Sequence, residues 1–241
     1  MIRLLQDITS ADPVTISAKK ITFDLNSYDL IFTNSLTVDN NAEVDYIRSG
    51  EFKVVYQTSG SAYALSVSNS KCLIKGVEIR RSDANTIYAL DCRNATVSVT
   101  GDVTAYNTNR LGGGAVGIRA ASSSSVTVGG IITAQASTYI SLGNSGYKTI
   151  ADFTEPTTKP GYLTYTDGDS IVGYSTVWVK AAALPSGTAP AISGPVSKTV
   201  TAGYAATSTD PYTVTGSPAP TVVKTSGNAG GHHLGRRGKK A

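Results

Sequence analysis

The chain has no proline between Pro13 and Pro156, although eight prolines occur from Pro156 onward. Proline lacks the N–H that a β ladder requires, so this long stretch permits continuous strand pairing. No apolar run approaches the ~18 residues of a membrane span, and we expect no membrane insertion. Only 16% of the residues are charged. The surface must therefore be largely neutral and polar, and the frequent Ser and Thr residues supply it.

Histidine and cysteine are scarce. His232 and His233 both lie in the C-terminal tail, which leaves the rest of the chain without imidazole for a Ser-His-Asp or Cys-His nucleophile. Cys72 and Cys92 are the only cysteines, too few for a disulfide framework or a zinc site. We expect both to be small buried side chains. The sequence therefore predicts no catalytic residues, no metal and no cofactor.

The net charge of +4 comes from the tail, where Arg236, Arg237, Lys239 and Lys240 lie. Without them the 21 basic residues become 17, which matches the 17 acidic residues. The body of the chain is therefore neutral. A basic face for nucleic acid is not expected.

Residues 62–136 contain an internal repeat without helical periodicity. YALSVSNSKCLIKG, from Tyr63, is followed at an offset of 25 by YALDCRNATVSVTG, from Tyr88, and VTVGGIITA follows at an offset of 29. The matched pairs at 25 are Tyr63/Tyr88, Leu65/Leu90, Val67/Cys92, Asn69/Asn94, Ile74/Val99 and Gly76/Gly101; those at 29 are Val97/Val126, Val99/Val128, Gly101/Gly130, Val103/Ile132 and Ala105/Ala134. In a fainter, earlier copy, Leu36, Val38 and Asn40 match Leu65, Val67 and Asn69 at the longer of the two offsets.

A period of 20–50 residues indicates a repeat architecture. The unit consists of short alternating runs that cannot bury their apolar side chains alone, so we predict an all-β fold: a right-handed parallel β-solenoid. Matched residues then stack in one core, with Leu65 over Leu90. Asn69 and Asn94 are expected to form an amide ladder at a corner.

Composition divides the chain into four parts. Residues 1–153 form the predicted β-solenoid. Residues 154–183 form a β-hairpin around Asp167-Gly168 that caps the open strand edges at its end. Residues 184–229 contain a linker and a second, incomplete β-segment, and residues 230–241 form the basic tail.

Two segments resemble known families. The coils YALDCRNATVSVTGDVTA and GIRAASSSSVTVGGIITA resemble the β-strand repeats of large bacterial surface proteins of the pectate-lyase-like parallel β-helix type. ISGPVSKTVTAGYAATSTDPYTVTGSPAPTVVKTSGNA resembles the first half of a bacterial Ig-like module. The resemblance implies an extracellular or cell-surface location, although MIRLLQDITS is not a signal peptide. It also implies that the chain is part of a longer parent protein.

The Ig-like segment is too short for a complete sandwich, which needs about seven strands over ~100 residues. After Asn228-Ala229 the sequence GGHHLGRRGKKA shows no alternation. We therefore hypothesise that the reading frame changes near Ala229.

Polysaccharide-cleaving enzymes of the β-helix type need catalytic carboxylates on one face of neighbouring coils. We place Asp91 opposite Ser66 in one neighbouring coil and Ala121 in the other, so no carboxylate column is predicted. Two local charge groups are interpreted as solvated surface charge: Asp45, Arg48 and Glu51, and Arg80, Arg81 and Asp83 with Asp91 and Arg93.

Two places are candidates for ligand contact. Tyr106 and Arg110 lie in the insertion AYNTNRLGGG, because loops on a rigid scaffold carry recognition. Tyr165 and Trp178 lie in the hairpin, together with Tyr162 and Tyr174, and aromatic rings stack on sugars. The alternatives are a tolerated surface insertion for the loop and the core of the end cap for the hairpin aromatics.

The expected function is a non-catalytic structural or adhesive module of a secreted bacterial surface protein. Its expected partners are cell-surface or extracellular polysaccharide and other domains of the parent chain. A polysaccharide lyase or glycoside hydrolase of the β-helix type is the first alternative. The second alternative is the remnant of a disrupted gene.

Overall fold

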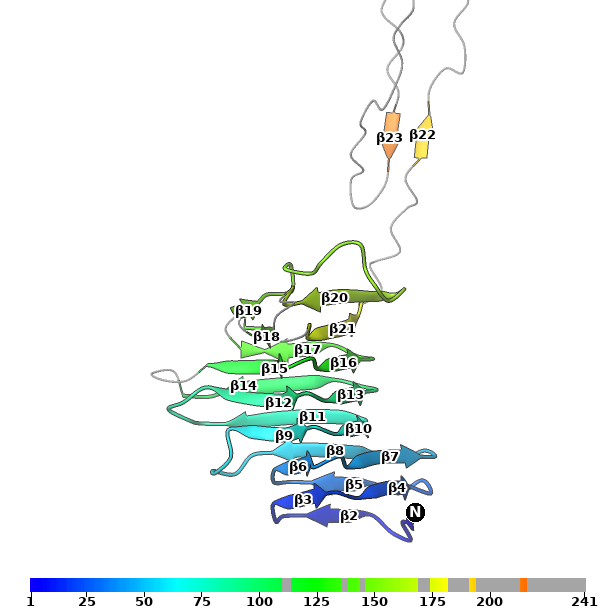
Figure 1. The fold of residues 1–241 in the computed structure, drawn as a ribbon, viewed down its shortest axis with the longest axis vertical. Coiled ribbons are helices and arrows are strands. Elements are labelled where there is room, and N and C mark those ends of the chain that lie inside the picture. Colours follow the sequence, from blue (N-terminus) through cyan, green and yellow to red (C-terminus); the bar gives the residue numbers. More distant parts are fainter. Residues whose placement is uncertain are drawn as a thin grey trace, which may run out of the picture. The chain divides into compact units, whose positions relative to one another are not determined.

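The computed structural model describes residues 1–109, 114–135, 138–143, 146–168, 174–181, 191–193 and 213–215. The chain divides into two compact units, Met1–Ala182 and Ala183–Ala241. The first unit is a parallel β-solenoid (Figure 1), which confirms the fold class predicted from the repeat. No α-helix occurs in the described ranges, and among them no helix is long and apolar enough to cross a membrane.

The solenoid has three sheets, here called A, B and C. Sheet A contains, in spatial order, β1 (Ile2–Arg3), β4 (Lys20–Asp24), β7 (Glu43–Ile47), β10 (Lys71–Ile74), β13 (Thr96–Val99), β16 (Ser125–Val128), β21 (Thr176–Lys180) and β20 (Tyr162–Thr166). Sheet B contains β17 (Ile132–Ala134), β14 (Val103–Asn107), β11 (Gly76–Arg81), β8 (Phe52–Tyr56), β5 (Leu30–Phe32) and β2 (Ile8–Ser10). Sheet C contains β19 (Gly146–Lys148), β18 (Ile140–Leu142), β15 (Ala115–Ala121), β12 (Ile87–Arg93), β9 (Tyr63–Ser68), β6 (Leu36–Asp39) and β3 (Val14–Ser17).

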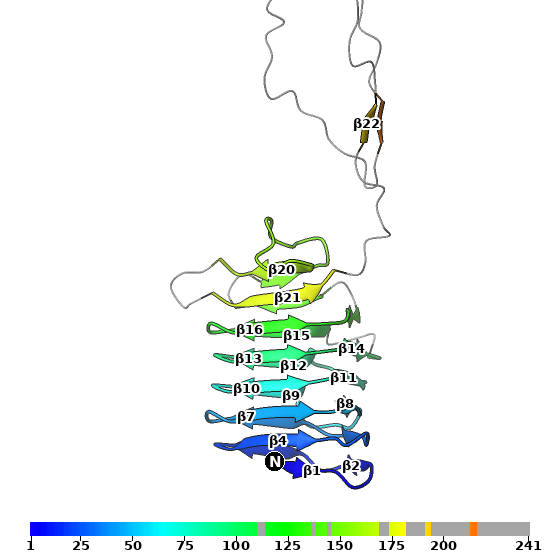
Figure 2. The same cartoon turned by 90° about the vertical axis from the view of Figure 1, so that its right-hand side faces the viewer.

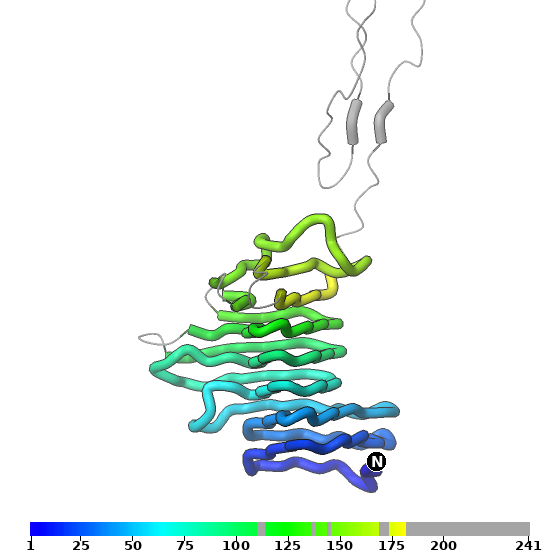
Figure 3. The backbone as a smooth tube through the Cα atoms, viewed as in Figure 1, coloured from blue at the N-terminus to red at the C-terminus, as the bar shows by residue number. Residues whose placement is uncertain are grey.

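The chain visits the sheets in the order A, B, C and then begins the next coil. Each strand from β1 to β15 pairs in parallel with the strand three places later in the sequence, whereas β16 pairs in parallel with β21 at the end of the solenoid. Figure 2 shows the strands of sheet A as successive levels, and the tube in Figure 3 follows the same levels from the N-terminus. Strand pairing therefore connects each coil to its neighbours along the solenoid.

The register agrees with the predicted repeat. Leu65 pairs with Leu90 and with Leu36 in sheet C. In sheet A, Val99 pairs with Ile74 and with Val128. All of these side chains are nearly or completely buried. The prediction that matched apolar residues share one dry core is confirmed.

Strand alternation separates the core from the outer surface. In β13, Val97 and Val99 are buried, whereas Thr96 and Ser98 face outward. Successive side chains of a strand point to opposite faces, so the short Ser/Thr–Val alternation fills the core with β-branched residues and covers the outside with hydroxyl groups. Aromatic packing contributes at the N-terminal coils, where the Phe23 and Phe52 ring centroids lie 5.4 Å apart.

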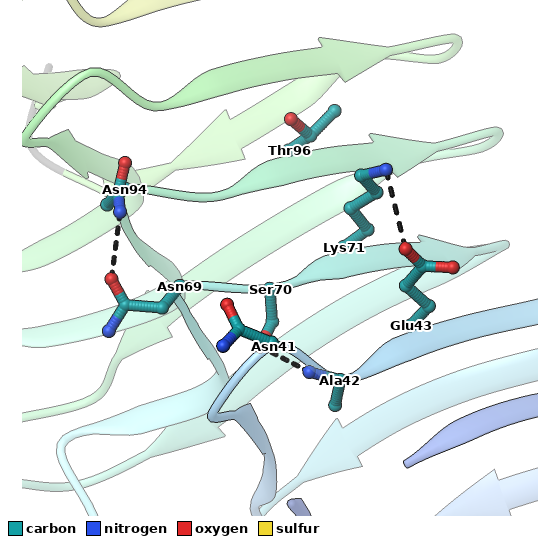
Figure 4. A pocket seen from close by; sticks show the side chains of 8 residues that line it. All are labelled: Asn41, Ala42, Glu43, Asn69, Ser70, Lys71, Asn94 and Thr96. Carbon is teal, nitrogen blue, oxygen red and sulfur yellow. Dashed lines mark hydrogen bonds and ion pairs between the residues drawn. The ribbon is translucent and has the colours of Figure 1, made fainter. Parts of the chain in front are cut away.

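The corner between sheets C and A uses left-handed backbone conformations. Asn69 and Asn94 both have φ near +48°, a region that Asn tolerates better than most residues. Asn94 Nδ2 donates to Asn69 Oδ1 at 2.8 Å (Figure 4). The predicted amide ladder is therefore present at this corner.

The same corner forms a shallow pocket, and several of the polar groups that line it bond to one another (Figure 4). The Ala42 N–H donates to Ser70 Oγ at 3.1 Å, and Lys71 Nζ lies 3.4 Å from Glu43 Oε1. The pKa of Glu43 is lowered by Lys20 and Lys71. We therefore interpret these contacts as stabilising the corner.

The C-terminal end of the solenoid carries two antiparallel additions. Strands β20 and β21 form a hairpin in which Tyr165 pairs with Val177, and β21 extends sheet A beside β16. Strand β19 pairs antiparallel with β18 in sheet C. The hairpin expected over residues 154–183 thus follows the last coil and covers the edge of sheet A.

The second unit contains one described pair, β22 (Ala191–Ser193) with β23 (Thr213–Thr215), which is antiparallel. The other residues assigned to the Ig-like segment, 184–229, and the tail, 230–241, lie outside the described residues. Cys72 and Cys92 are both buried and unbridged in the core of the first unit, as predicted.

Candidate functional site

The hairpin places two of the predicted ligand-contacting residues on opposite faces. Tyr165 is fully buried, and its hydroxyl donates to the Ile150 carbonyl at 3.0 Å. Its ring centroid lies 5.7 Å from that of Tyr139, and burial raises its pKa. Tyr165 therefore belongs to the core of the end cap and offers no surface to a ligand. Trp178 is half-buried on the outer face of sheet A.

The predicted loop site lies on a different sheet. Tyr106 faces outward from β14 in sheet B with 39% of its surface exposed. The guanidinium of Arg80 lies over its ring, 5.3 Å from the centroid. Arg110 lies outside the described residues. The structure therefore does not bring Tyr106 together with Trp178.

A patch of hydroxyl groups covers the outer face of sheet A next to the hairpin. We call it the hydroxyl face, and its members are Thr96, Ser98, Ser125, Thr127 and Thr176. Their register forms two columns, Thr96–Ser125–Thr176 and Ser98–Thr127–Trp178. Adjacent members of a column are separated by the inter-strand spacing of about 4.8 Å. The face thus presents hydroxyl groups at a regular interval along the solenoid.

Most hydroxyl groups of this face are available to a ligand. Among the described residues, the side chains of Thr96, Ser98, Ser125 and Thr176 make no hydrogen bond, whereas Thr127 Oγ1 accepts from Lys159 Nζ at 3.0 Å. Beneath them, the buried valines fix the strands in position. Because the backbone ladder holds each strand, the face is rigid before any ligand arrives.

The second column ends at a cluster of aromatic rings and one cation. Lys159 Nζ lies 4.6 Å from the ring centroid of Tyr162 and 5.5 Å from that of Trp178. Trp178 Nε1 donates to Thr158 Oγ1 at 2.8 Å, which fixes the indole. Lys159 connects this cluster to the hydroxyl face through Thr127. Trp178 is therefore held at the end of a hydroxyl column with part of its surface exposed.

The interpretation of Arg81 as a solvated surface charge is wrong. Only 5% of its side chain is exposed. Arg81 Nη1 donates to the Tyr56 hydroxyl and to the Thr58 carbonyl, both at 3.2 Å, and Nη2 pairs with Asp83 at 2.5 Å. Arg81 lies two positions after Ile79 at the end of β11, so strand alternation directs its side chain inward. There its hydrogen bonds and ion pair connect residues at the turn between sheets B and C.

The prediction for Asp91 is wrong in two respects. Asp91 pairs in register with Ser66 as predicted, but its other partner is Arg119, not Ala121. Asp91 is 3% exposed, so it is not a solvated charge. The offset between coils is 28 here in sheet C but 29 in sheet A. The extra residue lies at the corner, where Ser122–Ser124 replace a two-residue turn.

Arg119 makes several contacts that the sequence did not reveal. Its Nε donates to Asp91 Oδ1 at 2.5 Å, and Nη2 donates to the Tyr63 hydroxyl at 2.8 Å. Its guanidinium lies 4.9 Å from the Tyr63 ring centroid and 4.8 Å from that of Tyr88. Burial opposes its charge, but the bonds to Asp91 and Tyr63 outweigh burial and raise its pKa.

The repeat correctly places Tyr63 beside Tyr88, and their ring centroids are 5.5 Å apart. The signal for Arg119 is the shorter offset of sheet C, which aligns it with Asp91 once the corner insertion is recognised.

Within the described residues, no group of three or more His, Cys, Asp or Glu side chains is arranged to hold a metal ion.

No known family model, curated protein or solved structure matches this chain.

Proposed function

We propose that this protein is a non-catalytic structural and adhesive module that contacts polysaccharide through the hydroxyl face of sheet A. The observation that carries the proposal is the column of outward hydroxyl groups that ends at the half-buried ring of Trp178. Indole rings stack on the apolar faces of sugars. Hydroxyl side chains donate and accept hydrogen bonds, as sugar hydroxyl groups do.

The geometry suits an extended polymer that runs along the solenoid. Such a chain meets an equivalent hydroxyl group at each strand, and stacking on Trp178 fixes its position at one end. The two columns themselves carry no charged side chain between Thr96 and Thr176, although the Lys159 ammonium group lies beside Thr127 and Trp178 at one end. A neutral polar polymer therefore matches this surface better than a strongly charged one.

The solenoid itself supports the structural part of the proposal. Each coil buries its apolar side only against its neighbours, so stacked coils form a stiff module that displays its outer faces. The resemblance of the coils to bacterial pectate-lyase-like surface repeats, and of residues 192–229 to an Ig-like module, supports placement in a secreted surface protein with further domains. Polysaccharide cleavage by a β-helix enzyme is the alternative function.

The test measures retention of the full chain on insoluble polysaccharides and on a glycan array. Ser98→Arg and Ser125→Arg place a bulky cation on the hydroxyl face without touching the core, and each should reduce retention at least tenfold. Thr133→Arg, at an exposed position of sheet B, is the matched control and should bind as wild type does.

A second comparison separates the role of Trp178 from general exposure of aromatic rings. Trp178→Ala should lose binding, whereas Tyr174→Ala should retain it, because Tyr174 is 54% exposed in the same hairpin but outside the hydroxyl columns. Equal binding by Ser98→Arg and wild type, or no retention of wild type, would overturn the proposal. Release of soluble sugars from the polymer would instead favour the enzymatic alternative.

A further inference from the structure

We infer that the outer face of sheet C carries a second binding site, built from Arg93, Asp91 and Arg119 with Tyr63 and Tyr88, that takes the carboxylate of an acidic saccharide. The site lies on a different sheet from the hydroxyl face. The saccharide part of the inference rests on the proposed function, whereas the recognition of a carboxylate rests on the geometry of the cluster alone.

The cluster carries a net positive charge. Arg93 Nε lies 3.4 Å from Asp91 Oδ2, and Arg119 Nε binds the other oxygen, Asp91 Oδ1. Two guanidinium groups therefore share one carboxylate. Within the described residues, no other acidic side chain pairs with either arginine. One positive charge remains for an anionic ligand.

The fold does not require a charged group at this position. The residues that pair with Asp91 and Arg119 on the neighbouring coils are Ser66 and Ser141. The strands in these coils form the same ladder with small polar side chains. The buried carboxylate and its two cations are thus additional to what strand pairing needs, although burial of a charge is costly.

Arg119 is already fixed in place before a ligand binds. Asp91 and the Tyr63 hydroxyl hold its guanidinium from two sides, while the Tyr63 and Tyr88 rings pack against it. A side chain ordered in advance loses little conformational entropy on binding. Both tyrosines are half-buried, so the parts of their rings that Arg119 does not cover leave apolar surface beside the cations for a sugar ring.

Arg93 supplies the accessible donors. Its side chain is 55% exposed, and its ion pair uses Nε, so the two terminal nitrogens remain for a ligand. Its register partners are Ser68 and Ala121, both too small to cover it. The planar guanidinium fork matches the two oxygens of a carboxylate. The ligand is therefore expected to bring its carboxylate to Arg93 and its ring toward the tyrosines.

The experiment uses isothermal titration calorimetry on the full chain with two probes. One is a uronic-acid hexasaccharide, and the other is the same hexasaccharide with its carboxyl groups reduced to neutral alcohols. Wild type should bind the acidic hexamer at least tenfold more tightly than the reduced one. The preference should shrink as salt is raised, because exposed charges are screened.

Arg93→Ala should lose this preference while circular dichroism shows an intact fold. Arg80→Ala is the matched control, because Arg80 is 53% exposed and likewise pairs through Nε, with Glu78 at 3.1 Å, on sheet B. It should bind both hexamers as wild type does. A sulfated neutral hexamer distinguishes a general anion site, since it should bind more weakly than the uronate, and equally tight binding would contradict recognition of a carboxylate.

Several outcomes would overturn the inference: no binding of the uronate by wild type, unchanged binding by Arg93→Ala, or an equal loss in Arg80→Ala. Ser98→Arg separates this site from the proposed function. If it abolishes retention on neutral polysaccharide but leaves uronate binding intact, the two surfaces act independently. Loss of binding at one surface therefore does not imply loss of binding at the other.

Discussion

Leu65 and Leu90 lie directly opposite each other in sheet C, one coil apart, and both are fully buried. Each contributes an apolar side chain to the same column of the core, which continues to Leu36 in one direction and Ile118 in the other. A gap at one level of this column is therefore flanked by ordered strands on both sides and cannot collapse easily.

Leu90→Ala should destabilise the solenoid by about 2–5 kcal/mol, as large-to-small substitutions in packed cores do. The measurement is urea unfolding followed by circular dichroism. Ser66→Ala, on the outer face of the neighbouring coil, serves as the control and should change the free energy of unfolding by less than about 0.5 kcal/mol. Equal effects of the two substitutions would contradict a shared core built from matched residues.

Two substitutions of Asn94 in the amide ladder separate the cost of losing the side-chain hydrogen bond from the cost of the left-handed backbone conformation. Asn94 adopts a left-handed conformation and donates to Asn69. Asn94→Ala loses the hydrogen bond and also places a β-carbon in an unfavourable region, for a total cost of about 2 kcal/mol. Asn94→Gly loses only the hydrogen bond and should cost about 1 kcal/mol. Urea denaturation of the two variants measures the difference, and a glycine variant less stable than the alanine variant would contradict the argument.

The sequence predicts the register where the corner turns keep their length. Between β9 and β12, and between β10 and β13, the offset is 25 in both sheets, so one matched pair is enough to align the coil. The predicted partner of Asp91, Ala121, lies 30 residues later in the sequence, whereas the observed partner, Arg119, lies 28 residues later. The extra residue at the corner before β16 makes the offset of sheet A 29, so it accounts for one of the two positions. A local insertion of this kind changes which outer side chains meet, but leaves the apolar alternation intact.

Contacts between side chains on the outer face are also harder to predict because some of them cross more than one coil. Arg119 reaches back across two coils to Tyr63, 56 residues earlier, so its partners do not share its position in the repeat. The hydroxyl face, in contrast, follows directly from alternation, because its members in β13 and β16 lie between buried valines. Trp178 joins it only because β21 extends sheet A, a pairing that no repeat in the sequence indicates.

Removal of Arg119 leaves the buried carboxylate of Asp91 with one cation instead of two, which should lower the stability of the fold. Arg119→Ser removes one of two cations from a carboxylate that is 3% exposed and should destabilise the fold by about 2 kcal/mol, less than for a pair with no second cation. The double variant Asp91→Ser/Arg119→Ser mimics the Ser66 and Ser141 positions of the neighbouring coils and should recover most of that loss. Thermal and urea unfolding measure both. If the double variant is less stable than Arg119→Ser, the pair is required by the fold and is not additional to it.

The two buried thiols predict both low reactivity and a loss of stability at alkaline pH. Burial raises the pKa of Cys72 to about 12, from an ordinary value of 9.0, and burial also raises the pKa of Cys92. Because the thiolate is the reactive form, native protein at pH 8 should react with iodoacetamide far more slowly than protein in concentrated urea. Labelling followed by mass spectrometry measures the two rates.

The sign of the pH dependence follows from the same shift. A raised folded-state pKa means that the fold favours the neutral thiol, so this stability is fully present below pH 9 and is lost as the pH rises from 9 toward 12. The urea midpoint should therefore fall between pH 8 and pH 10.5. Cys72→Ala, compared at the same two pH values, should show a smaller fall because it lacks one of the thiols, and tyrosine ionisation contributes equally to both proteins. An identical fall in both would show that Cys72 is not the group responsible.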